Sequence, residues 1–219
     1  MSENTEFDKP IEDNTSEGYI ALKYAHEKGL EIDKYLGKGH FGEAYLTKDS
    51  KVIKVTKDAR EAYTGLLLMD NGHDNIVDIF NVEKLSEKWF VIEQEYTNHN
   101  YDADELYWGL TNIIDEHGYE SISELLEESN FHKFTPDEEL ISALTQLKEA
   151  KEHMESLGIG SGGVDMQADN YSYIDGKIKT FDNMDSTLRQ DEARELINKI
   201  LNPTLKNDAK NKRKSLKNN

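Results

Sequence analysis

The sequence predicts an α+β fold in which an antiparallel sheet with one inserted helix precedes a mostly helical region. Short runs rich in β-branched and aromatic residues fill the N-terminal half, as is typical of strands. After Tyr96 the apolar residues recur at helical spacing instead. The 219 residues suffice for one domain of ordinary size or two small ones.

The N-terminal half begins with a predicted helix over residues 18–28, which Gly29 ends before a strand enters Leu36 and Gly37. Small and unbranched side chains then predict a single helix over 59–69. The other segments of this half are predicted strands, at 44–47, 51–55, 76–80 and 88–92, with turns at 49–50 and 85–87.

The C-terminal half is predicted to be helical with one hairpin. Residues 104–116 place Leu106, Leu110 and Ile113 on one face, and Gly118 ends that helix. The longest helix is expected to begin at a capping box, Thr135 to Glu138, with Pro136 at the first helical position, and to reach Leu157. The remaining elements are a hairpin, 171–174 with 177–181 around Asp175-Gly176, and a last helix over 189–201.

Charge divides the chain unevenly. Its 26 basic and 44 acidic residues give a net charge of -18, but residues 206–219 carry +5 and the rest -23. This tail is either a solvated, disordered end or a segment that docks on an acidic partner. Residues 1–17 are acidic and nearly devoid of apolar side chains, so we expect them to be disordered. The folded domain is therefore expected at 18–205.

Composition also excludes several classes of protein. The mean hydropathy of -0.79 and the lack of a long apolar run argue against a membrane span, and no signal peptide is evident, so we expect a cytoplasmic protein. The absence of cysteine excludes disulfides, a thiol nucleophile and a cysteine zinc site. The acidic charge repels nucleic acid, so direct nucleic-acid binding is not expected.

A glycine-rich turn follows the first predicted strand. Residues 36–42 read LGKGHFG and place a G-x-G-x-x-G pattern at Gly37, Gly39 and Gly42. An ordinary hairpin can also need glycines for positive φ. A dinucleotide-binding turn requires a helix after the third glycine, but a strand is predicted here, which fits the phosphate-covering loop of a protein kinase.

A lysine lies in the apolar strand that comes next. Lys54 stands in the run VIKV, where an ammonium is costly unless it reaches solvent or an anion. Glu61, on the following predicted helix, is a candidate partner that would hold Lys54 against the α- and β-phosphates of ATP. A solvent-directed Lys54 and a solvated Glu61 remain the simpler alternatives.

Acidic and amide side chains recur downstream in the order that phosphoryl transfer requires. Asp165 and Asn170 have the D-x-x-x-x-N spacing, and Asp182 follows the predicted hairpin. A carboxylate can orient the acceptor hydroxyl, which is the role expected of Asp165. Carboxylate and amide oxygens can bind Mg²⁺, which is the role expected of Asn170 and Asp182. Any one of these residues could simply form a turn.

Together these motifs match the known signature set of protein kinases over most of the chain. Within kinases, residues 36–41, 52–55, 61–64 and 165–166 resemble the early serine/threonine protein kinase of autographiviruses, podovirus-like phages. The resemblance covers about residues 18 to 200. It implies a reduced two-lobed kinase-like fold, with a sheet lobe at 18–95 and a small, truncated helical lobe at 96–205.

The resemblance also implies a function. The chain would be an ATP- and Mg-dependent kinase made early in infection, in the host cytoplasm, with host protein substrates that include RNA polymerase or RNA-processing enzymes. Backbone groups near Glu93 and Glu95 would meet the adenine, and Ile92 would lie at the back of the pocket. A strand residue facing the core explains Ile92 equally well.

Three departures from the signature leave other functions open. Gly163 and Val164 replace the usual His-Arg, Gln167 stands where kinases place a basic residue, and Asn183 is counted at the Gly of D-F-G. Gln167 is the departure that bears most on catalysis, because a neutral amide offers only hydrogen bonds to the transferred phosphoryl group. The alternatives are a pseudokinase that binds and inhibits a host or defence protein, and a small-molecule phosphotransferase.

Overall fold

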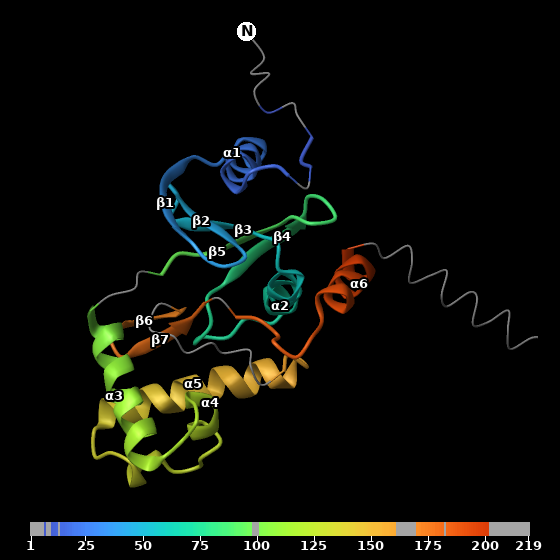
Figure 1. Ribbon diagram of the computed structural model, residues 1–219. Helices are drawn as coiled ribbons and strands as arrows, with labels where there is room; N and C mark the ends of the chain where they lie inside the picture. The colour runs from blue at the N-terminus through green and yellow to red at the C-terminus, as the bar shows by residue number, and fades with distance from the viewer. Residues whose placement is uncertain are drawn as a thin grey trace, which may run out of the picture.

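The computed structural model describes residues 7, 10–12, 14–97, 101–160, 170–181 and 183–201, and it is an α+β structure as the sequence predicts. Figure 1 shows a sheet flanked by helices in the upper part of the molecule and a helical region beneath it. The elements of the N-terminal half are α1 (Glu17–Lys28), β1 (Ile32–Lys38), β2 (Gly42–Thr47), β3 (Lys51–Thr56), α2 (Ala59–Asp70), β4 (Ile79–Lys84) and β5 (Phe90–Glu95). Those that follow are α3 (Tyr101–His117), α4 (Ile122–Leu125), a short 3₁₀ helix η2 (Phe131–Lys133), α5 (Glu138–Ser156), β6 (Tyr171–Ile174), β7 (Lys177–Thr180) and α6 (Gln190–Leu201).

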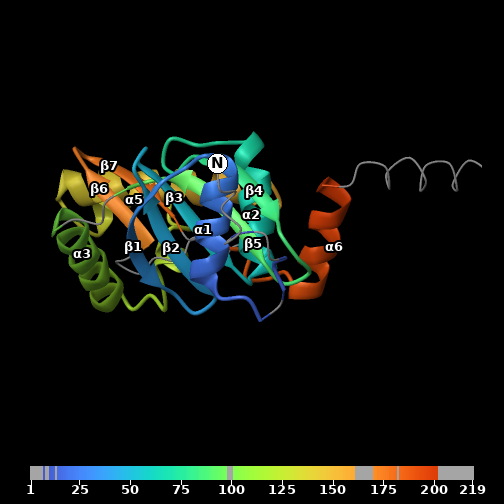
Figure 2. The same ribbon diagram turned by 90° about the horizontal axis from the view of Figure 1, so that it is seen from above.

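The five strands of the first half form one antiparallel sheet in the order β1-β2-β3-β5-β4. Successive side chains of a strand point to opposite faces, so β3 and β5 each supply both faces. Ile53 and Val91 are buried against α1, and Ile92 is buried against α2. The sheet is thus covered by α1 on one face, as Figure 2 shows from above, and by α2 on the other.

The helical region has its own apolar core between α3, α5 and the β6-β7 hairpin. Leu106, Leu110 and Ile113 of α3 are buried there, as their helical spacing predicts. Leu144 and Leu147 of α5 pack into the same core. Among the helices that the structure describes, none is long and apolar enough to cross a membrane.

The hairpin joins this region to the sheet. Asp175 (φ 51°) and Gly176 (φ 76°) both have positive φ, as in the tight turn that the sequence predicts. Thr180 at the end of β7 donates its backbone N–H to the carbonyl of Asn75 (2.9 Å), and its own carbonyl accepts the N–H of Val77 (3.0 Å). These bonds fix β7 to the segment that leads into β4.

The same bonds explain one wrong prediction. The strand expected at 76–80 begins only at Ile79, because the backbone groups of Asn75 and Val77 bond to Thr180 at the end of β7. The predicted start of α5 is also wrong. Asp137, and not Thr135, is its N-cap and accepts the N–H groups of Glu139 (2.9 Å) and Leu140 (3.3 Å). Asp caps a helix as well as Thr does, so the sequence offered two starts.

The two ends of the chain also differ from expectation. Residues 1–17 were expected to be disordered, but the described ones among them contact the domain: Ile11 packs near α1, and the Glu12 carbonyl accepts the indole N–H of Trp89 (3.2 Å). At the other end, α6 falls within the predicted helical lobe but packs against α2 beside the sheet. The basic residues 206–219 lie outside the described part.

Candidate functional site

The structure forms the ion pair between Lys54 and Glu61 that the sequence suggests. Both side chains are largely buried, with exposed fractions of 16% and 10%. Lys54 lies opposite Ala44 of β2 and Ile92 of β5, so it is in the middle of the sheet, on the face that α2 covers. The pair therefore connects the central strands to the helix, and its contact with phosphate stays a prediction.

The start of α2 positions Glu61 in the first turn of the helix. Asp58 is the N-cap and accepts the backbone N–H of Arg60 (2.8 Å), and it also pairs with the Arg60 guanidinium (2.6 Å). Burial of the Asp58 carboxyl opposes its ionisation, but the hydrogen bonds from Arg60 outweigh burial and hold the pKa of Asp58 below its ordinary value. The negative charge of Asp58 at the N-terminus of α2 also interacts favourably with the helix dipole and stabilises the helix.

The three glycines in and beside the turn between β1 and β2 have different environments. Gly39 donates its N–H to the carbonyl of Gly42 (2.9 Å) and closes the turn. A Cβ on Gly42 would lie 1.9 Å from the carbonyl oxygen of Val55, so the close approach of β2 to β3 requires that glycine. A Cβ on Gly37 would meet no atom within 4 Å. Gly37 lies at an irregularity in the register between β1 and β2, and the open space above it leaves its backbone accessible to a ligand.

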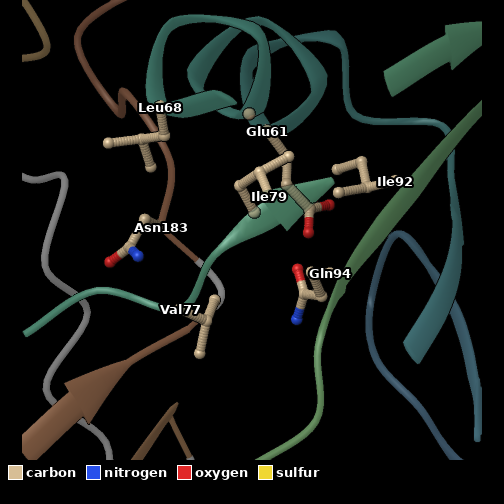
Figure 3. A pocket seen from close by; sticks show the side chains of 8 residues that line it. Glu61, Leu68, Val77, Ile79, Ile92, Gln94 and Asn183 are labelled. Atoms are coloured by element: carbon tan, nitrogen blue, oxygen red, sulfur yellow. The ribbon is translucent and has the colours of Figure 1, made fainter. Parts of the chain in front are cut away.

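A cavity adjoins the ion pair beneath α2. Figure 3 shows Glu61 from α2, Gln94 from β5 and Asn183 from the segment after β7 around it. The remaining lining is Gly65, Leu68, Val77, Ile79 and Ile92. Asn183 is 7% exposed. Among the described residues, its Oδ1 is the one buried side-chain nitrogen or oxygen atom that lacks a hydrogen-bond partner.

Two residues of this cavity escaped the sequence analysis. Gln94 lies two positions after Ile92 and so shares its face of β5, and Gly65 lies four positions after Glu61 and so shares its face of α2. The spacing of two residues in a strand and of four in a helix could therefore have predicted that Gln94 and Gly65 face the cavity. Ile92 is buried in the cluster beneath α2, and Gln94 extends the same row toward the end of β5.

Asn183 was also misplaced in the motif. It directly follows Asp182 and therefore occupies the Phe position of D-F-G, and not the Gly position that the sequence comparison assumed. In the structure Asn183 lies under α2 and lines the cavity.

The hairpin brings the ends of the predicted metal-binding segment together. The carbonyl of Asn170, just before β6, accepts the N–H of Phe181, just after β7, at 2.9 Å. Asn170 is thereby fixed beside the residue that precedes Asp182. Asp165, Gln167 and Asp182 themselves lie outside the described residues. Within the described ranges no group of three or more His, Asp or Glu side chains is arranged to hold a metal ion.

The expected adenine contacts of backbone groups near Glu93 and Glu95 stay a prediction. Glu93 lies within the ladder between β3 and β4, and its carboxylate pairs with Lys51 (2.8 Å). The N–H of Glu95 donates to the carbonyl of Asp78 (2.8 Å), and its carboxylate pairs with Lys179. Both residues thus belong to the strand ladder, and their carboxylates form ion pairs. The first residues after the ladder are Tyr96 and Thr97.

The described part of the site therefore combines the buried pair of Lys54 with Glu61, a glycine-rich turn with open space at Gly37, and the amide of Asn183 beside the cavity. A scan against protein-family models finds no match for the chain, and no curated protein matches it.

Proposed function

We propose that the chain is an ATP- and Mg-dependent serine/threonine protein kinase of a phage that phosphorylates host proteins. The observation that carries the proposal is the ion pair of Lys54 with Glu61, because a lysine on the third strand held by a glutamate on the next helix is the phosphate-binding arrangement of protein kinases. The order of the remaining motifs in the sequence supports the same conclusion.

Two features of the described residues support a nucleotide as the ligand. Gly37 leaves space over the turn between β1 and β2, so its backbone can come close to phosphate oxygens. Glu61 holds the Lys54 ammonium inside the fold, where a charge-assisted contact with phosphate is strong. Asn170 and Asp182 would hold magnesium, which, when bound, neutralises charge on the phosphates.

The remaining roles belong to residues known from the sequence alone. Asp165 would orient the acceptor hydroxyl and accept its proton, and Gln167 would donate a hydrogen bond to the transferred group. Host RNA polymerase or RNA-processing enzymes are the proposed substrates, by resemblance. The net charge of -18 would speed encounters with basic surfaces on such partners.

A pseudokinase is the second candidate, and one structural observation favours it. The Phe of D-F-G sets the active arrangement in kinases by its packing, but here Asn183 fills that place beside a cavity. Together with the neutral Gln167, this change would weaken transfer while leaving nucleotide binding intact. The protein would then act by sequestering a host or defence protein.

One experiment separates these functions. The purified chain is incubated with γ-labelled ATP, magnesium and host lysate, and nucleotide binding is measured in parallel. Label on proteins is the result expected of a protein kinase. Nucleotide binding without transfer would favour the pseudokinase, and label only on metabolites would favour a small-molecule phosphotransferase. If the chain neither binds the nucleotide nor transfers label, the assignment of the site is overturned.

A further inference from the structure

The last helix of the chain packs on the helix that carries Glu61. In Figures 1 and 2 α6 lies beside α2, at the opposite end of the molecule from α3. Ala193 and Ile197 of α6 are fully buried in the apolar cluster beneath α2. Their neighbours in that cluster are Ala59, Ala62, Leu66, Val82, Phe90 and Ile92, with Tyr63, Ile79 and Leu188 at its edge. The helix α2 is therefore held between the sheet and α6.

Polar contacts from α6 fix the start of α2. The Gln190 side-chain oxygen accepts the backbone N–H of Ala59, the first residue of α2, at 2.9 Å. This N–H is one of the groups at a helix start that have no partner within the helix. Arg194 donates to the carbonyls of Glu87 (2.6 Å) and Lys57 (3.1 Å), so it connects α6 to the chain on both sides of the cluster.

The segment between Asn183 and α6 contacts α2 as well. Asp185 donates its backbone N–H to the hydroxyl of the fully buried Thr64 (3.2 Å), one turn after Glu61. The Asp185 carboxylate in turn accepts the Thr187 hydroxyl (2.6 Å) and the N–H of Leu188 (3.2 Å). The Thr187 hydroxyl, five residues after the predicted metal-binding Asp182, is thus already hydrogen-bonded within the segment.

We propose that Gln190 and Arg194 are positioning residues that hold Glu61 in place to pair with Lys54. The proposal rests on the proposed kinase function, in which that pair must be formed for transfer. In this chain Asn183 and Gly65 line the cavity under α2, and α6 packs against the same helix. The Lys54–Glu61 pair is therefore already formed without a phosphate on Thr187.

The test uses the full chain with the paired substitution Gln190→Met and Arg194→Met. Methionine keeps most of the side-chain length and apolar packing but removes the hydrogen bonds to Ala59, Glu87 and Lys57. The matched control is Arg189→Met, because the Arg189 guanidinium pairs with the exposed Asp191 and is itself 73% exposed. Two readouts are taken on each protein: amide hydrogen exchange over residues 59–70, and kcat and KM for ATP in the transfer assay.

We expect the double variant to exchange at least about tenfold faster over 59–70 and to lose at least about tenfold in kcat/KM, with exchange over α3 and α5 unchanged. The control should match the wild type in both readouts. Unchanged exchange over 59–70, or faster exchange with an unchanged kcat/KM, would overturn the positioning role. An inactive wild type would instead refute the kinase proposal, and the exchange data would still decide whether α6 holds α2.

Discussion

The ammonium of Lys54 on β3 pairs with the carboxylate of Glu61 on α2, and the pair is largely buried between the sheet and the helix. A lysine in the middle of an apolar strand is costly unless its charge is compensated. Glu61 supplies that compensation, and the N-cap Asp58 and the packed α6 hold the helix that carries it.

A double-mutant cycle separates the structural role of the pair from its chemical role. Lys54→Met should abolish transfer and also cost about 3 kcal/mol of stability, because it leaves the Glu61 carboxylate buried without its partner. The double variant Lys54→Met with Glu61→Gln should recover most of the unfolding temperature but no transfer. Thermal unfolding and labelled transfer measure the two effects. Recovery of transfer in the double variant would contradict the role of Lys54.

The glycine turn allows a matched comparison of two glycines. Gly42→Ala should lower the unfolding temperature by about 4 °C or more, since its Cβ would collide with the Val55 carbonyl and overpacking costs about 1–3 kcal/mol. Gly37→Ala should leave unfolding unchanged and weaken ATP binding, because only a ligand would meet the added methyl group. Calorimetry of unfolding and of ATP binding tests both. Equal ATP affinity in wild type and Gly37→Ala would remove this turn from the nucleotide site.

Acid should remove the contribution of Asp58 to stability. The pKa of Asp58 lies below its ordinary value of 3.8, so the charged form stabilises the fold above that pH, and this stabilisation is lost as the pH falls through the lower, folded-state pKa. Asp58→Asn keeps a capping oxygen but has no charge. The difference in urea midpoint between wild type and Asp58→Asn should be constant from pH 5 to 7 and shrink below about pH 3.8. A difference that grows in acid would contradict the assigned pKa.

Gln167 tests whether transfer is limited by missing positive charge. Gln167→Lys should raise the transfer rate, since an ammonium would give a charge-assisted contact with the transferred phosphoryl group. Gln167→Met, which removes the hydrogen bonds of the amide, should lower it. Rates are compared at saturating ATP. An unchanged or lower rate in the lysine variant would show that another residue already supplies the charge.

The sequence was sufficient where a local signal decides the structure. The Asp175-Gly176 turn, the stripe of Leu106 and Leu110, and the approach of Glu61 to Lys54 all follow from short-range patterns. It was insufficient where distant segments compete for the same backbone groups. The backbone groups of Asn75 and Val77 bond to Thr180, so β4 begins later than predicted. The helix α6 packs against α2 and not within the helical region. The cavity beside Asn183 depends on three elements and has no local signature.

The most direct test of the account is transfer from γ-labelled ATP by the wild type and by Asp165→Ala, with ATP affinity measured on both proteins. Asp165 is assigned to the acceptor hydroxyl and not to the nucleotide, so its loss should affect chemistry and spare binding. The account predicts labelled host proteins with the wild type, a loss of at least about 100-fold in transfer with Asp165→Ala, and ATP affinities within about threefold of each other. Equal labelling by the two proteins, or no labelling by either, would contradict it.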